Sequence, residues 1–101
     1  MKFGLKKKIV EHIHTVFAEF PQVEEAILYG SRAKGNFKPG SDIDLTLIGE
    51  SINLQVLNGI SRLLADSSIP YTVDISIFSH IDNEDLLDHI KRVGVVFYRK
   101  Q

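Results

Sequence analysis

Apolar positions along the chain recur with two different periods, and each period predicts a kind of element. Spacing of three or four residues indicates an amphipathic helix. The segments with this spacing are 3–20, 52–66 and 82–93. Pro21 ends the first helix, and Gly59 slightly weakens the second. Asp82 or Asn83 can cap the third helix, and Gly94 follows its last turn.

Short runs of apolar or alternating residues predict strands between these helices. The predicted strands are 26–29, 42–48, 71–78 and 95–98. Gly, Pro, Asn and Ser make 31–41 a loop, with room for one helical turn at its start. The order α, β, β, α, β, α, β predicts an α+β, two-layer fold in which a mixed sheet of about four strands carries helices on one face. Its second face should be at least partly open. We treat residues 1–101 as a single domain.

Composition and charge exclude several classes of protein. The formal net charge is −1, so the chain does not have the basic surface that nucleic-acid binding needs. The absence of cysteine excludes disulfides and thiolate zinc sites, and it favours a reducing cytoplasm. No secretory signal is visible at the N-terminus, and no apolar run approaches the ~20 residues that span a bilayer. These features predict a soluble cytoplasmic protein.

Three aspartates fall on the polar side of two predicted strands. Side chains alternate across a strand, so Asp42 and Asp44 lie opposite the apolar residues of 42–48, and Asp74 lies opposite those of 71–78. If the two strands are neighbours, the three carboxylates converge and require a cation. Oxygen ligands at this density suit magnesium or manganese better than zinc. Asp-x-Asp alone could equally be the exposed face of an edge hairpin, and Asp74 favours the metal site.

The sequence Gly30-Ser31-Arg32 lies just upstream and suits phosphate binding. Glycine allows close approach to the backbone, a serine hydroxyl can donate to a phosphate oxygen, and arginine offers a fork of donors. A plain turn is the alternative for Gly30-Ser31. Phe37, in the loop, could stack on a base or dock on the core.

At this point the sequence resembles the DNA polymerase β-type nucleotidyltransferase superfamily. The shared pattern is Tyr29-Gly30-Ser31, then Asp42-Ile43-Asp44-Leu45, with Asp74 as the later strand carboxylate. The variant GSRA-x-G followed by SDIDL, in so short a chain, is similar to the minimal nucleotidyltransferases (MNT) of bacteria and archaea. The resemblance covers nearly the whole chain.

The resemblance implies a fold and a mechanism. Asp42, Asp44 and Asp74 would hold two magnesium ions, and manganese could replace them. Gly30 and Ser31 would bind the β- and γ-phosphates of ATP or another nucleoside triphosphate. Arg32 would either touch the triphosphate or brace the loop. An acceptor hydroxyl would attack the α-phosphate, with Asp74 helping to remove its proton, and pyrophosphate would leave.

The family also implies a partner. Minimal nucleotidyltransferases are paired with a helical HEPN-class toxin, so the chain would act as an antitoxin that transfers AMP from ATP to a tyrosine of that toxin. One alternative is a nucleotide-binding module that masks its partner without catalysis. Another is transfer to a small molecule such as an aminoglycoside. A homodimer or a hetero-oligomer is compatible with both classes, and the base preference stays open.

The four histidines show no metal-ligand spacing. His12 and His14 are two residues apart on a helix and cannot share a face. His80 precedes the last helix, and His89 lies within it. All four are predicted to be surface or interface residues.

Overall fold

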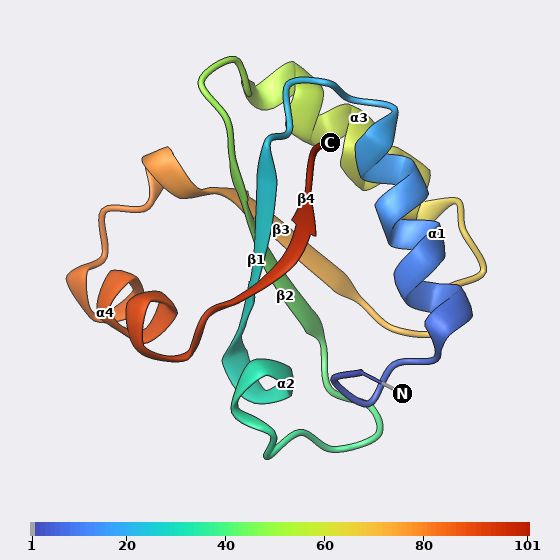
Figure 1. Cartoon of the computed structure of the whole chain (residues 1–101), viewed down its shortest axis with the longest axis vertical. Coiled ribbons are helices and arrows are strands. Elements are labelled where there is room, and N and C mark those ends of the chain that lie inside the picture. The colour runs from blue at the N-terminus through green and yellow to red at the C-terminus, as the bar shows by residue number, and fades with distance from the viewer. Residues whose placement is uncertain (1) are drawn as a thin grey trace.

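The computed structural model describes residues 2–101 as four strands in one mixed sheet with helices around it (Figure 1). The elements are α1 (Lys7–Ala18), β1 (Glu25–Tyr29), α2 (Gly30–Lys34), β2 (Ile43–Ile48), α3 (Leu54–Ala65), β3 (Val73–Ile77), the 3-10 turn η1 (Phe78–His80), α4 (Glu84–Val93) and β4 (Val95–Arg99). The strand order is β3-β2-β1-β4. β1 is antiparallel to both β2 and β4, and β2 is parallel to β3. The α+β fold with a mixed four-stranded sheet is therefore confirmed.

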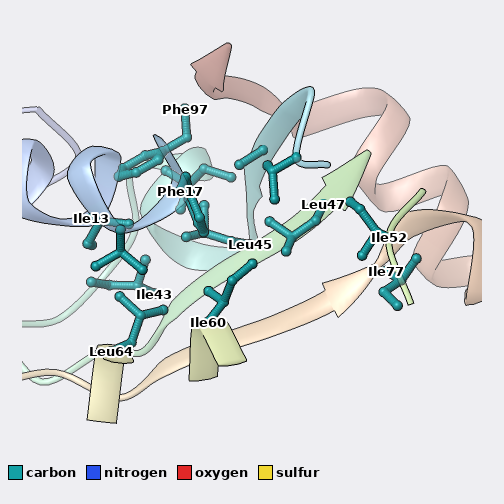
Figure 2. Close-up of a cluster of buried hydrophobic side chains, with 14 of the residues drawn as sticks. Ile13, Phe17, Ile43, Leu45, Leu47, Ile52, Ile60, Leu64, Ile77 and Phe97 are labelled. Atoms are coloured by element: carbon teal, nitrogen blue, oxygen red, sulfur yellow. The ribbon is translucent and has the colours of Figure 1, made fainter. Parts of the chain in front are cut away.

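The main core lies between one face of this sheet and the helices α1 and α3. Ile43, Leu45 and Leu47 of β2 are completely buried, and Figure 2 shows them facing side chains of the two helices. Phe17 of α1 and Ile60 of α3 are also completely buried. Burying one such side chain contributes roughly 1.5–3 kcal/mol, so this layer holds the sheet to the two helices.

The helices differ from the predicted ranges mainly at their ends. The first helix begins at Lys7, because Phe3 and Gly4 adopt positive φ values of 58° and 72° that no helix accommodates. The helical turn expected after Gly30 is present as α2. Asn83 caps α4 by accepting a hydrogen bond from the Leu86 amide at 3.0 Å. No helix within residues 2–101 is long and apolar enough to cross a bilayer.

The position of α4 corrects the prediction that all helices cover one face. α1 and α3 lie on one side of the sheet, whereas α4 lies on the other side, beside β1 (Figure 1). A Cβ added to Gly94, at the end of α4, would lie 2.9 Å from a methyl of Ile27. The side chain of Ile27 points away from the main core, because Ala26 and Leu28 alternate with it and are buried there. The second face is therefore partly covered.

Candidate active site

The pairing of β2 with β3 brings two of the three predicted carboxylates together. Asp44 pairs directly with Asp74 in the parallel register, so both side chains lie on the face opposite the main core. Asp42 is exposed and lies one residue before β2 begins at Ile43. On the other side of β2, Tyr29 pairs with Asp44 and joins the same face. The predicted convergence of the strands is thus present, with Asp42 at its margin.

Hydroxyl groups continue this polar face along the strands. The Ser76 hydroxyl donates to the Thr46 hydroxyl at 3.0 Å, and this pair lies two residues beyond Asp44 and Asp74 on the same face. Burial raises the pKa of the Tyr29 hydroxyl, a hydrogen bond with Ser76 opposes this rise, and the charges of Asp44 and Asp74 add to it. Tyr29, the Thr46 and Ser76 hydroxyls and the two carboxylates therefore lie on one polar face of the sheet, where Thr46 is completely buried.

The pKa of Asp44 depends on its burial and on the neighbouring charges. Burial is the largest cause that raises its pKa, and the charges of Asp74 and Asp42 raise it further. The electrostatic interaction with His89 acts in the opposite direction. Within residues 2–101 no three His, Asp or Glu side chains are already gathered closely enough to hold a metal ion. Like charges repel, so a closer approach of these carboxylates needs a compensating cation.

Gly30 forms the turn between β1 and α2 and lies against Asp44. Its φ of +76° is in the left-handed region that favours glycine. A Cβ at this position would also collide with Oδ2 of Asp44. Ser31 follows in the first turn of α2 and is half-buried. The turn that the sequence pattern predicted for phosphate binding is therefore in contact with the carboxylate face.

Arg32 is turned away from this turn and into the protein. Its side chain is 2% exposed. The guanidinium donates to the carbonyl of Ser41 through Nε at 3.2 Å and Nη2 at 3.0 Å, and to the carbonyl of Phe3 through Nη1 at 2.9 Å. It also lies 5.0 Å from the ring centre of Phe37 and 4.6 Å from that of Tyr71. Of the two predicted roles, these contacts favour bracing of the loop over contact with the triphosphate.

Phe37, like Arg32, is directed toward the protein. Its ring packs on Arg32, and a Cβ added to Gly4 would collide with it. The loop aromatic therefore packs on Arg32 and the N-terminal segment, whereas the predicted alternatives were stacking on a base and docking on the core.

His89 is a residue of this site that the sequence prediction missed. The backbone N–H of Gly30 donates to its Nε2 at 3.0 Å. Its ring meets that of Tyr29 edge to face, with 6.1 Å between the ring centres. A sequence signal existed, because His89 lies three residues after Leu86 and four before Val93. This spacing places it on the apolar stripe of α4 rather than on the solvent face.

Comparison with known proteins identifies the family of the chain. The family described as "Polymerase beta, Nucleotidyltransferase" matches residues 11–101. A protein of Haemophilus influenzae (strain Rd) named "Probable protein adenylyltransferase MntA" is 31% identical over 101 residues, which is 99% of this chain and 88% of the relative.

Solved structures share the fold. The crystal structure of a toxin–antitoxin with AMP-PNP has a TM-score of 0.72 at 19% identity, covering 91% of this chain and 74% of that one. A complex of tri-AMPylated Shewanella oneidensis HEPN toxin with MNT antitoxin has a TM-score of 0.68 at 16% identity, covering 96% and 75%. At these identities the similarity concerns the fold. The match over residues 11–101 and the Haemophilus relative show that the chain belongs to the polymerase β-type nucleotidyltransferase family.

Proposed function

We propose that the chain is a magnesium-dependent protein adenylyltransferase that transfers AMP from ATP to a tyrosine of a HEPN-class toxin and thereby acts as its antitoxin. The observation that carries this proposal is the pairing of Asp44 with Asp74 beside the Gly30 turn. The name of the Haemophilus relative supports transfer of AMP to a protein. The AMPylated HEPN toxin bound to an MNT antitoxin supports the partner class.

The residues present fit magnesium as the cofactor. Asp42, Asp44 and Asp74 offer only oxygen donors, which suit magnesium. Burial, together with the charges of Asp74 and Asp42, raises the pKa of Asp44, and a bound cation would oppose this rise. We propose that these three side chains would hold two magnesium ions, and that manganese could replace them. Bound magnesium would neutralise the triphosphate and favour ionisation of the acceptor hydroxyl.

The chain's own residues would bind and orient the substrates. The lack of a side chain at Gly30 lets Asp44 lie against the turn, and the Ser31 hydroxyl would donate to the β- or γ-phosphate. Arg32 would hold the loop 31–41 in place through Ser41 and Phe3. The acceptor oxygen would form a bond to the α-phosphorus while the bond to the bridging oxygen breaks, and pyrophosphate would leave. Asp74 is exposed at this face and would accept the acceptor's proton.

A direct experiment is to incubate the protein with ATP, magnesium and the HEPN-class protein encoded by a neighbouring gene, and to weigh that protein by mass spectrometry. The expected result is added mass of one or more AMP groups on a tyrosine. The Asp44→Asn variant should add none. A folded, active wild-type mixture without added AMP would contradict the proposed activity.

A masking module makes a different prediction in cells. If the chain neutralised its toxin by binding alone, the Asp44→Asn variant would still protect cells that express the toxin. We expect protection to be lost. A protein that only masks its partner does not need a crowded set of carboxylates, so their presence favours catalysis. Co-purification of the variant with the toxin is the control that separates lost chemistry from lost binding.

A further inference from the structure

His89 connects α4 to the turn that carries the proposed phosphate-binding residues. It is half-buried, and its Nε2 accepts the hydrogen bond of the Gly30 amide at 3.0 Å. The edge-to-face contact with Tyr29 fixes the plane of its ring from a second direction. A histidine on α4 therefore restrains residues that lie about sixty positions earlier in the sequence.

The direction of this hydrogen bond defines the state of the imidazole. Because the Gly30 N–H is the donor, Nε2 must carry the lone pair, and the proton of the neutral ring is on Nδ1. The ring is then an acceptor toward the turn and not a competing donor. His89 thus differs from a phosphate ligand, which would have to donate.

The restrained residue is the one with the greatest backbone freedom in the turn. Gly30 has a φ of +76°, and glycine moves between positive and negative φ at little cost. The orientation of Gly30 sets where the next residue, Ser31, points relative to Asp44. Without an acceptor for its amide, the turn would sample several orientations. Nucleotide binding would then have to order the turn, and this loss of conformational entropy would weaken binding.

We propose that His89 is a positioning residue that holds the Gly30–Ser31 turn in the orientation that binds the triphosphate. This inference rests on the proposed adenylyltransferase function. His89 acts through the turn and does not contact the reacting atoms, so its loss should weaken ATP binding rather than slow the chemical step. One hydrogen bond of this kind corresponds to a change in KM for ATP of about three- to tenfold.

The test compares two substitutions at His89 with a matched histidine elsewhere. His89→Ala removes the acceptor and should raise KM for ATP about three- to tenfold, with kcat within about twofold of wild type. His89→Gln supplies a carbonyl acceptor and should recover part of the loss. His14 is the control, because its Nε2 also bonds a backbone group, the Phe97 carbonyl, at 2.6 Å and lies partly buried. His14→Ala should lower Tm and leave KM for ATP unchanged.

Hydrogen exchange of the Gly30 amide gives a readout that does not depend on catalysis. In wild type this amide should be protected, and in His89→Ala it should exchange faster, with His89→Gln in between. Equal exchange in wild type and His89→Ala would overturn the inference, as would a KM for ATP within twofold of wild type in a folded His89→Ala. If that variant did not fold, His89→Phe, which also removes the acceptor but keeps a ring to pack on Tyr29, would decide by the same two measurements. If the wild-type protein neither transferred AMP nor bound ATP, the proposed function would be overturned instead. Hydrogen exchange of the Gly30 amide would still show whether the hydrogen bond to His89 exists.

Discussion

The two faces of strands β2 and β3 differ in role although they share one backbone, because one face is apolar and the other carries carboxylates. On one face Ile43, Leu45 and Leu47 are completely buried and pack against α1 and α3 (Figure 2). On the other face Asp44 and Asp74 are paired, and burial, with the charges of Asp74 and Asp42 adding to it, raises the pKa of Asp44. The buried residues of the first face should tolerate substitution by other apolar residues of similar volume. The aspartates of the second face should not tolerate the loss of their charge. Alternation along the strand lets one element serve stability and chemistry separately.

The largest effect should come from changing the charge on the second face. Asp44→Asn keeps the shape of the side chain and removes the charge, so we expect transfer of AMP to fall by about a thousandfold or more while the far-UV circular dichroism is unchanged. Initial rates with ATP and magnesium measure it. The control is Asp66→Asn, an exposed carboxylate at the end of α3. A rate within tenfold of wild type for Asp44→Asn would refute the role of this carboxylate.

The matching change on the first face should act on stability. Leu45 is next to Asp44 in the sequence but is completely buried. Leu45→Ala should lower the free energy of unfolding by about 2–5 kcal/mol, measured by urea denaturation. Leu45→Met, which conserves volume, should cost less than about 1.5 kcal/mol. Under conditions where both variants are folded, the KM for ATP should stay near that of wild type, and a large change in it would show that the two faces are not independent.

Arg32 allows the comparison to be extended to the loop that leads from α2 to β2. Arg32→Lys keeps the charge but loses the planar fork of donors that binds the carbonyls of both Ser41 and Phe3. If Arg32 braces the loop, the variant should lose about 1–2 kcal/mol of stability in the absence of nucleotide. Thermal unfolding without ATP measures this loss. Unchanged stability combined with weaker ATP binding would instead indicate direct contact with the triphosphate.

The smallest expected effect is a gain in the stability of the protein when the charge of Asp44, on the second face, is removed. The pKa of Asp44 is raised above its ordinary value of 3.8, so the folded state binds a proton more readily than the unfolded state. Stability therefore falls as pH rises through this window, and the full penalty is present above the raised pKa. In metal-free buffer near neutral pH, Asp44→Asn should raise Tm by about 2–4 °C, a value reduced for solvent screening.

The control for this gain is the pH dependence of the same comparison. The difference in Tm between Asp44→Asn and wild type should shrink as the pH falls through the raised pKa of Asp44, because the wild-type carboxyl then becomes protonated. A variant less stable than wild type at neutral pH in metal-free buffer would contradict the repulsion among Asp42, Asp44 and Asp74.

Sequence pattern predicted the strands and the face on which Asp44 and Asp74 lie, because alternation is a property of each strand alone. It did not predict the position of α4, since an apolar stripe shows that a helix is buried but not on which side of a sheet. The role of His89 was missed for the same reason, because the residue meets Gly30 only after the sheet has formed. Both roles of Arg32 were open from its chemistry, and the structure favours one through its burial.

The order of the strands has a consequence for how the chain can be made. β1 lies inside the sheet, and one of its two neighbours is β4, so that Glu25 and Arg99 meet although they are 74 positions apart. During synthesis from the N-terminus, the edge of β1 that pairs with β4 stays unpaired until residues 95–99 have left the ribosome. Gly30, Asp44, Asp74 and His89 emerge before that. A nascent chain therefore contains all of these residues while its sheet is still open, and such non-local pairing is the slow part of β folding.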